Sequence, residues 1–150
     1  MTTDLEATDR QILDLLVADG RMSYTDLGKA TGLSTSAVHQ RVRRLEGRGL
    51  ILGYRALVDQ ELAGLPLTAF VSITPIDPAE PDDYPERLTG IAAIESCWSV
   101  AGEESYILKV RVAKPSALEE LLARIRSVAN VSTRTTIVLS TPYEGRSVGS

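Results

Sequence analysis

The chain has 150 residues, of which 43% are hydrophobic and 24% charged, and this composition excludes a wholly disordered or low-complexity protein. Its formal net charge is −4 and Cys97 is its only cysteine, which excludes an intramolecular disulfide and leads us to expect the cytoplasm. The apolar runs fall far short of the roughly 20 residues that cross a bilayer, and the sequence predicts neither a membrane segment nor a signal peptide.

The charge is unevenly distributed along the chain. Residues 1–60 contain eight basic and eight acidic side chains, whereas residues 61–150 contain eight and twelve. Within the first part, residues 29–55 have six basic side chains and one acidic side chain, Glu46. An acidic protein therefore contains a basic patch, and such a patch attracts nucleic-acid phosphates.

Two helices are predicted at the start of the chain. Thr8 and Gln11 form a capping-box pattern that begins the first, and its apolar stripe ends near Gly20. Ser23 is the expected N-cap of a second helix of about two turns. Gly32 ends this helix, because glycine adopts the left-handed conformation at little cost.

A third helix is predicted to begin at Ser34, only a tight turn after the second. Val38, Val42 and Leu45 recur at spacings of four and three, so this stripe packs inward. At about 100° per residue, Arg41 lies nearer the packed side, and we expect it to contact a phosphate or an intramolecular acid. The outward positions are polar, basic or small: Ser36, Gln40, Arg43 and Gly47, with His39 and Arg44 on the flanks.

This outward face has the side-chain types that recognise DNA. A tight turn before a basic third helix is typical of a helix-turn-helix module, whose third helix enters the major groove. Arginine pairs with guanine, glutamine with adenine and serine with either, and a helix N-terminus holds a phosphate. The residues expected to contact DNA are Ser34, Thr35, Ser36, His39, Gln40, Arg43, Arg44 and Arg55. The alternative is a solvated helix face.

The run LILGYRALVD follows the third helix and ends the first domain. It alternates weakly and contains Gly53, which favours a short two-stranded wing that carries Arg55. The segment DQELAGLP is then predicted to be a linker. We therefore expect a winged helix-turn-helix domain at 1–58, a linker at 59–66 and a second domain at 67–150.

The second domain is predicted to be α+β. Its expected order is strand 67–75, helix 81–90, strands 91–100 and 105–113, helix 115–128 and strand 133–141. This β-α-β-β-α-β order is the ferredoxin-like pattern. Cys97 and Trp98 are expected to be buried in the core or a dimer interface. A capping box of Ser116 and Glu119 is expected to begin the long helix. The apolar face of this helix is predicted to consist of five residues: Leu118, Leu121, Leu122, Ile125 and Val128.

Reactive side chains are too few for an enzyme. One histidine and one cysteine cannot build a zinc site of His and Cys ligands, and no glycine-rich phosphate loop is present. Asp82 with Asp83, and Glu103 with Glu104, are pairs that could bind a metal or serve as acid and base, the alternative being solvated loop charges. We expect no catalytic residue, no metal and no cofactor.

The motifs DRQILDLL, LGKATGLSTSAV, RVRRLE and GLILGY, in this order, resemble the Lrp/AsnC, or feast/famine, family of transcription regulators. The likeness covers almost the whole chain. It implies a winged DNA-binding domain joined to a RAM/ACT-like effector domain that dimerises through its sheet and assembles into tetramers or octamers. It also implies an amino acid effector bound at clefts between subunits, so that 67–150 would be a ligand-binding and oligomerisation domain.

Two further motifs resemble those of the effector domain. Members often have a turn like GDYDYLLK, and here Gly102, Tyr106, Leu108 and Lys109 match it. Ser105 replaces an acidic residue, so Glu103 or Glu104 would hold an effector's ammonium. NVSTRTTIVL resembles a second motif, GVxRTxTxIVL, with Asn130 in place of glycine and one residue fewer. The resemblance thus implies these effector contacts: Gly102, Glu103, Glu104, Ser105, Thr133, Thr135 and Thr136. The alternative for the threonines is an ordinary place in a strand.

The sequence therefore predicts a sequence-specific regulator that binds double-stranded DNA and responds to a small effector, an amino acid, between effector domains of a homo-oligomer. The alternative function is a ligand-binding or assembly module without regulated DNA binding.

Overall fold

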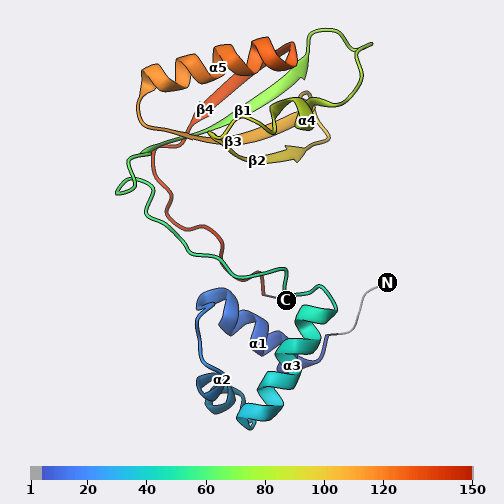
Figure 1. Cartoon of the computed structure of the whole chain (residues 1–150), viewed down its shortest axis with the longest axis vertical. Coiled ribbons are helices and arrows are strands. Elements are labelled where there is room, and N and C mark those ends of the chain that lie inside the picture. Colours follow the sequence, from blue (N-terminus) through green and yellow to red (C-terminus); the bar gives the residue numbers. More distant parts are fainter. Residues whose placement is uncertain (1–4, 150) are drawn as a thin grey trace. The chain divides into compact units, whose positions relative to one another are not determined.

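A computed structural model describes residues 5–149 of the chain. It divides into two compact units, of which one contains 5–57 and 142–149 and the other is Val58–Thr141 (Figure 1). The C-terminal segment 142–149 thus groups with the N-terminal helices, and Ser147 donates a hydrogen bond to Asp14.

The first unit contains α1 (Ala7–Ala18), α2 (Tyr24–Thr31) and α3 (Thr35–Gly47). Both predicted serine caps are confirmed, since Ser23 Oγ accepts from Asp26 N at 3.0 Å and Ser34 Oγ accepts from Ala37 N at 3.2 Å. Gly32 ends α2 at φ 75°, as predicted.

The predicted capping box of α1 is wrong. The N-cap is Glu6, so Thr8 lies inside the helix, and the structure shows no side-chain cap at this end. Gln11 instead donates from Nε2 to Ala30 O at 3.1 Å and joins α1 to α2. Acidic side chains at the first turn already favour the positive end of the helix dipole, so the start does not depend on a hydroxyl.

The three helices enclose a small apolar core. Its fully buried residues come from all three helices: Ile12, Leu27, Val38, Val42 and Leu45. The inward stripe predicted for α3 is therefore confirmed. Gly28 allows α2 and α3 to approach closely, because a Cβ there would lie 2.6 Å from Leu33 O.

The predicted two-stranded wing is wrong. Residues 51–58, all described, contain no strand, and Leu52 and Leu57 are 95% and 93% exposed. A ribbon needs a reverse turn and a facing strand to pair its backbone groups. The run is extended, but it pairs with no strand within residues 5–149.

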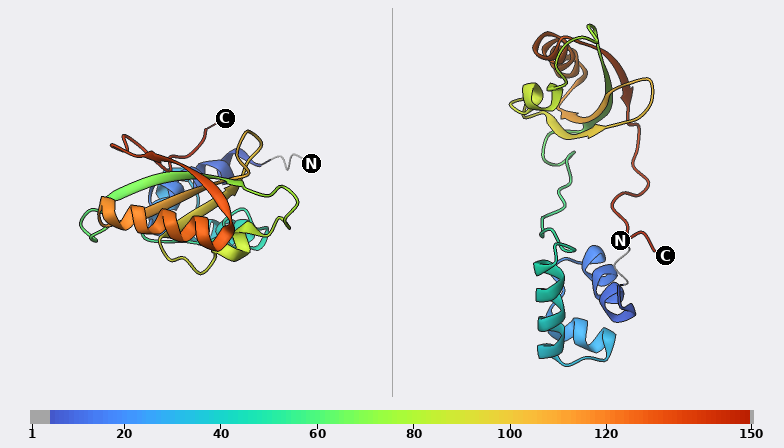
Figure 2. Two further views of the ribbon diagram at one scale, coloured as in Figure 1. Left: turned by 90° about the horizontal axis from the view of Figure 1, so that it is seen from above. Right: turned by 90° about the vertical axis from the view of Figure 1, so that its right-hand side faces the viewer.

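The second unit has the predicted α+β, ferredoxin-like order. Its elements are β1 (Leu67–Pro75), α4 (Tyr84–Leu88), β2 (Ile94–Ser99), β3 (Tyr106–Val112), α5 (Pro115–Ala129) and β4 (Val131–Ile137). The strands form one antiparallel sheet in the order β2-β3-β1-β4. Helices α4 and α5 cover one face of this sheet and enclose the core (Figures 1 and 2).

The start of α5 differs from the prediction. Lys114 is the N-cap and Pro115 the first helical residue, so Ser116 lies inside the helix and forms no capping box with Glu119. Proline is favoured at this first position, where its missing N–H needs no partner.

The end of α5 and the start of β4 are also shifted. Val128 is 42% exposed, whereas its neighbour Ala129 is fully buried. Asn130 then adopts φ 53°, which ends the helix within one residue, so β4 begins at Val131 instead of Thr133.

The other face of the sheet is not covered by any part of residues 5–149. Phe70 and Trp98 contact each other there with ring centroids 6.4 Å apart, and Trp98 is 46% exposed. Cys97 is exposed as well. Of the two alternatives for Cys97 and Trp98, a place in the core is therefore wrong, because β2 is an edge strand, and a place in a dimer interface stays a prediction.

Candidate nucleic-acid interface and effector segments

The predicted DNA-contacting side chains of α3 lie on its solvent side. Among them, the following are exposed: Thr35, Ser36, His39, Gln40, Arg43 and Arg44. Ser34 is the helix cap, and its hydroxyl lies 3.2 Å from that of Ser36. Arg55 is exposed but lies in the extended run after α3, not on a wing. The structure thus brings the α3 residues together and leaves Arg55 outside the helix.

Arg41 points away from this face. Its Nη1 lies 2.8 Å from Glu6 Oε2 and 3.0 Å from Asp9 Oδ1, and these hydrogen bonds raise the pKa of Arg41. Asp9 is only 8% exposed, so Arg41 neutralises a nearly buried carboxylate. The expected contact between Arg41 and an intramolecular acid is confirmed.

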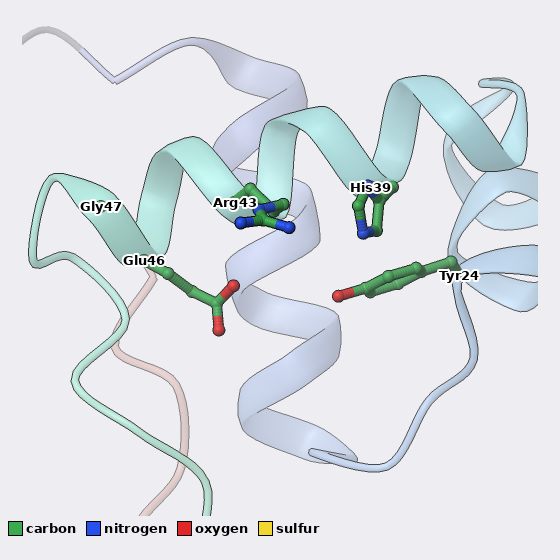
Figure 3. Close-up of a pocket in the computed structure, with 5 residues that line it drawn as sticks. All are labelled: Tyr24, His39, Arg43, Glu46 and Gly47. Atoms are coloured by element: carbon green, nitrogen blue, oxygen red, sulfur yellow. The ribbon is translucent and has the colours of Figure 1, made fainter.

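A hollow of about 510 Å³ lies beside the exposed face of α3. Figure 3 shows His39, Arg43 and Glu46 projecting from α3 on the side where Tyr24 reaches from α2. The rings of Tyr24 and His39 meet edge to face at 5.3 Å. Burial, and then the Glu46 carboxylate, raise the pKa of Tyr54, so Glu46 acts on the run after α3 as well.

Tyr24 and Glu46 were not among the residues predicted for DNA contact. The spacing contained a signal for Glu46, which follows His39 by seven residues and Arg43 by three, and therefore shares their flank of the helix. Tyr24 had no such signal, because its place depends on how α2 packs against α3.

The first candidate effector segment connects β2 to β3. Gly102 and Glu103 are exposed, whereas Glu104 and Ser105 are half-buried. The connection is tied to the sheet, because Ser105 N donates to Ile73 O at 3.0 Å and Val100 N donates to Ser105 O at 3.1 Å. The backbone thus fixes the end of this connection, and the acidic side chains extend from it.

The second candidate segment is β4. Thr133 is opposite Ile73 of β1, which also pairs with Tyr106, so Thr133 and the 102–105 connection lie at the same end of the sheet. Thr133 Oγ1 accepts from Arg126 Nη1 at 3.2 Å. Thr136 is opposite Phe70 and projects to the uncovered face, because successive strand residues alternate. Thr135 shares the helix-covered face with Thr133, so the structure does not bring the three threonines together.

Residues 5–149 contain no group of His, Cys, Asp or Glu side chains arranged to hold a metal ion. None of their helices is both long enough and apolar enough to span a membrane.

Comparison with known proteins matches both units. The profile of the AsnC-type helix-turn-helix domain matches residues 5–46, and that of the Lrp/AsnC ligand binding domain matches residues 68–148. The chain is 55% identical over 146 residues to the HTH-type transcriptional regulator LrpA of Mycobacterium tuberculosis, covering 97% of each chain. It is 38% identical over 141 residues to the leucine-responsive regulatory protein of Escherichia coli K12, covering 91% of this chain and 85% of that one.

A solved structure of a family member is similar to this chain over nearly its whole length. The feast or famine regulatory protein from M. tuberculosis complexed with L-methionine matches with a TM-score of 0.92 and 55% identity. The match covers 96% of this chain and 98% of that one.

Proposed function

The chain belongs to the Lrp/AsnC family of transcriptional regulators, and from this membership we propose which of its residues bind DNA and which bind the effector. It is a DNA-binding regulator that responds to an effector, and its family is one of regulators and not of enzymes.

DNA binding is proposed for the exposed face of α3 in domain 1–58. The observation that carries this proposal is the division of the arginines, since Arg41 is held by Glu6 and Asp9 while Arg43 and Arg44 are exposed. Gln40 and Arg43 contact base edges, and the two flanking side chains, His39 and Arg44, contact phosphates. Thr35, Ser36 and the amides after the Ser34 cap hold a phosphate at the helix N-terminus, and Arg55 adds a contact from the run after α3.

The test measures affinity for the protein's own promoter region by fluorescence anisotropy at physiological salt. Gln40→Ala and Arg43→Ala each lose a base contact that is worth about 1–3 kcal/mol, so affinity falls between about fivefold and 150-fold. Arg10→Ala removes an exposed arginine of α1 and serves as the control for charge. Equal affinity of all three variants and the wild type would show that this face does not bind DNA.

The effector is proposed to be an amino acid that binds at the 102–105 connection of domain 67–150. Glu103 and Glu104 supply the negative charge for its ammonium group, and Gly102, Ser105 and Thr133 lie at the same end of the sheet. Thr135 and Thr136 are further candidates on β4. L-Methionine is the first amino acid to test, because a relative of 55% identity is complexed with it.

A thermal-shift screen of the twenty amino acids tests the effector. A ligand present at 100 times its Kd stabilises the folded protein by about 2.7 kcal/mol. At ~10 mM, an amino acid with a Kd of ~0.1 mM therefore gives a clear rise in melting temperature. If no amino acid raised it, the effector class would be wrong, whereas a rise abolished by Glu103→Gln with Glu104→Gln would support the proposed site.

The active form is proposed to be a homodimer that assembles further into a tetramer or octamer and binds double-stranded DNA in the cytoplasm. The uncovered sheet face supports the dimer, because Phe70 and Trp98 place aromatic surface where no part of the chain covers it within residues 5–149. A dimer also presents two α3 helices to two half-sites.

A further inference from the structure

We infer that Asp82 and Arg87 are positioning residues for the effector site: they join the 77–83 loop to both candidate effector segments through hydrogen bonds and ion pairs. This inference rests on the effector site proposed above. The sequence suggested no role for Arg87, and it left Asp82 either as a solvated loop charge or as one of a carboxylate pair that could bind a metal or serve as acid and base.

A hydrogen bond links the 77–83 loop to the 102–105 connection. Tyr106 follows Ser105 directly, is 8% exposed, and donates from its hydroxyl to Asp82 Oδ1 at 2.8 Å. Its ring lies in the core and its backbone pairs with Ile73 in the sheet, so the position of the phenol hydroxyl is fixed. Asp82 is therefore held at a fixed distance from the residue where the 102–105 connection ends.

Contacts of Arg87 link the same loop to the end of α5. Arg87 lies on α4 and contacts two loop carboxylates, with Nη1 3.2 Å from Glu80 Oε2 and Nη2 2.7 Å from Asp83 Oδ1. Its Nη1 also donates to Ala129 O at 3.1 Å. The guanidinium thus holds the loop and the last carbonyl of α5 in one cluster.

Asn130 completes this cluster. It has φ 53° at the turn from α5 to β4, and its Nδ2 donates to Glu80 Oε1 at 2.8 Å. Ile76 N donates to Asn130 O at 3.3 Å on the loop's other side. Because β4 begins immediately after Asn130, the position of Thr133 depends on the same loop that Tyr106 fixes through Asp82.

The loop is thus a common support for two segments that are nearly 30 residues apart in sequence. Displacing the 102–105 connection moves Tyr106, and its bond to Asp82 transmits the strain to Glu80, Arg87 and the start of β4. We place Asp82 and Arg87 behind the ligand and not in contact with it.

The structure offers a matched control for the tyrosine. Tyr84 is 2% exposed and its ring lies 6.2 Å from that of Tyr106, but within residues 5–149 its hydroxyl has no hydrogen-bond partner. Tyr106→Phe and Tyr84→Phe remove the same atom from neighbouring buried rings, and only the first breaks a hydrogen bond. Glu120→Gln on the exposed side of α5 is the control for Asp82→Asn.

The experiment measures amide hydrogen exchange of the ligand-free full chain and, in parallel, calorimetric affinity for L-methionine. Tyr106→Phe and Asp82→Ala are expected to raise exchange at residues 100–105 severalfold, with the core amides of α5 unchanged. Affinity falls about tenfold in each, and the double variant falls no further than the singles. Asp82→Asn keeps an acceptor oxygen and retains most of the affinity. DNA affinity without ligand is unchanged.

Unchanged exchange at 100–105 in both single variants would overturn the inference, as would additive losses of affinity in the double variant. The two proposals fail separately. If the wild type does not bind L-methionine, that choice of effector is wrong, while the exchange data still decide whether Asp82 and Tyr106 position the connection.

Discussion

At the residue scale, the arginines of α3 have different roles because they project from the helix axis in different directions. Arg41 faces two acids, whereas Arg43 and Arg44 face solvent. Helix periodicity predicted that Arg41 would meet an acid or a phosphate. It did not identify Glu6 and Asp9, because they precede Arg41 by more than 30 residues and their position depends on the packing of α1.

Arg41→Ala is expected to destabilise the first unit by on the order of 1 kcal/mol, because Asp9 is left nearly buried without its partner. The effect is moderate, since the side chain of Arg41 is 23% exposed and water screens the pair. Urea denaturation measures the loss, with the exposed neighbour Arg44→Ala as the control. If the two variants were equally stable, the pair would contribute nothing.

Tyr106 makes stability depend on pH in the alkaline range. The hydrogen bond to Asp82, with burial, raises the pKa of this phenol above its ordinary value of about 10. The free energy of unfolding that this pKa shift contributes is fully present below the unfolded-state pKa. It declines at higher pH, because the unfolded chain then loses a proton that the folded chain retains. Tyr106→Phe should weaken the decline between about pH 9 and 11, measured by urea denaturation. The exposed tyrosine variant Tyr143→Phe should decline as steeply as the wild type.

At the element scale, Gly28 determines how closely α2 and α3 approach. Gly28→Ala is expected to cost about 1–3 kcal/mol, since a Cβ would overlap Leu33 O in backbone that cannot yield easily. Gly47→Ala is the control, because nothing lies within 4 Å of that Cβ. There alanine favours the helix by roughly 0.5–1 kcal/mol. Thermal unfolding distinguishes the two, and a neutral Gly28→Ala would contradict the geometry.

The elements themselves were largely predictable from local patterns. Ser23, Gly32 and Ser34 act within a few residues, so their caps were read correctly from sequence. The absence of the wing was not predictable, because a strand forms only with a pairing partner. No short-range pattern shows that residues 51–58 lack such a partner within residues 5–149. The faces to which the β4 threonines project were not predictable for a similar reason, since they follow from a strand that starts at Val131, and their contact with an effector stays a prediction.

At the scale of the whole molecule, the uncovered sheet face predicts the assembly state. Phe70→Glu places a charge in that face, and because burying a charge is costly, the variant should sediment as a smaller species than the wild type. Val17→Glu, at a 51% exposed position on α1, should sediment as the wild type does. Equal sedimentation of all three proteins would place the interface elsewhere.

Trp98 gives a second measure of this assembly, because it is the only tryptophan in the chain. It is 46% exposed in the single chain, so burial between two sheets should shift its emission to shorter wavelength. Dilution of the wild type should reverse the shift. Emission that is independent of concentration and identical in Phe70→Glu would argue against a sheet-mediated dimer.

The grouping of residues 142–149 with the N-terminal helices makes the effector unit, in sequence terms, an insertion within the DNA-binding unit. Such a unit has two junctions, one near Val58 and one near Thr141. A chimera that exchanges effector units between regulators must therefore join the chain correctly twice. A chimera that is joined correctly only at the first junction also replaces residues 142–149. It then loses Ser147, which donates a hydrogen bond to Asp14.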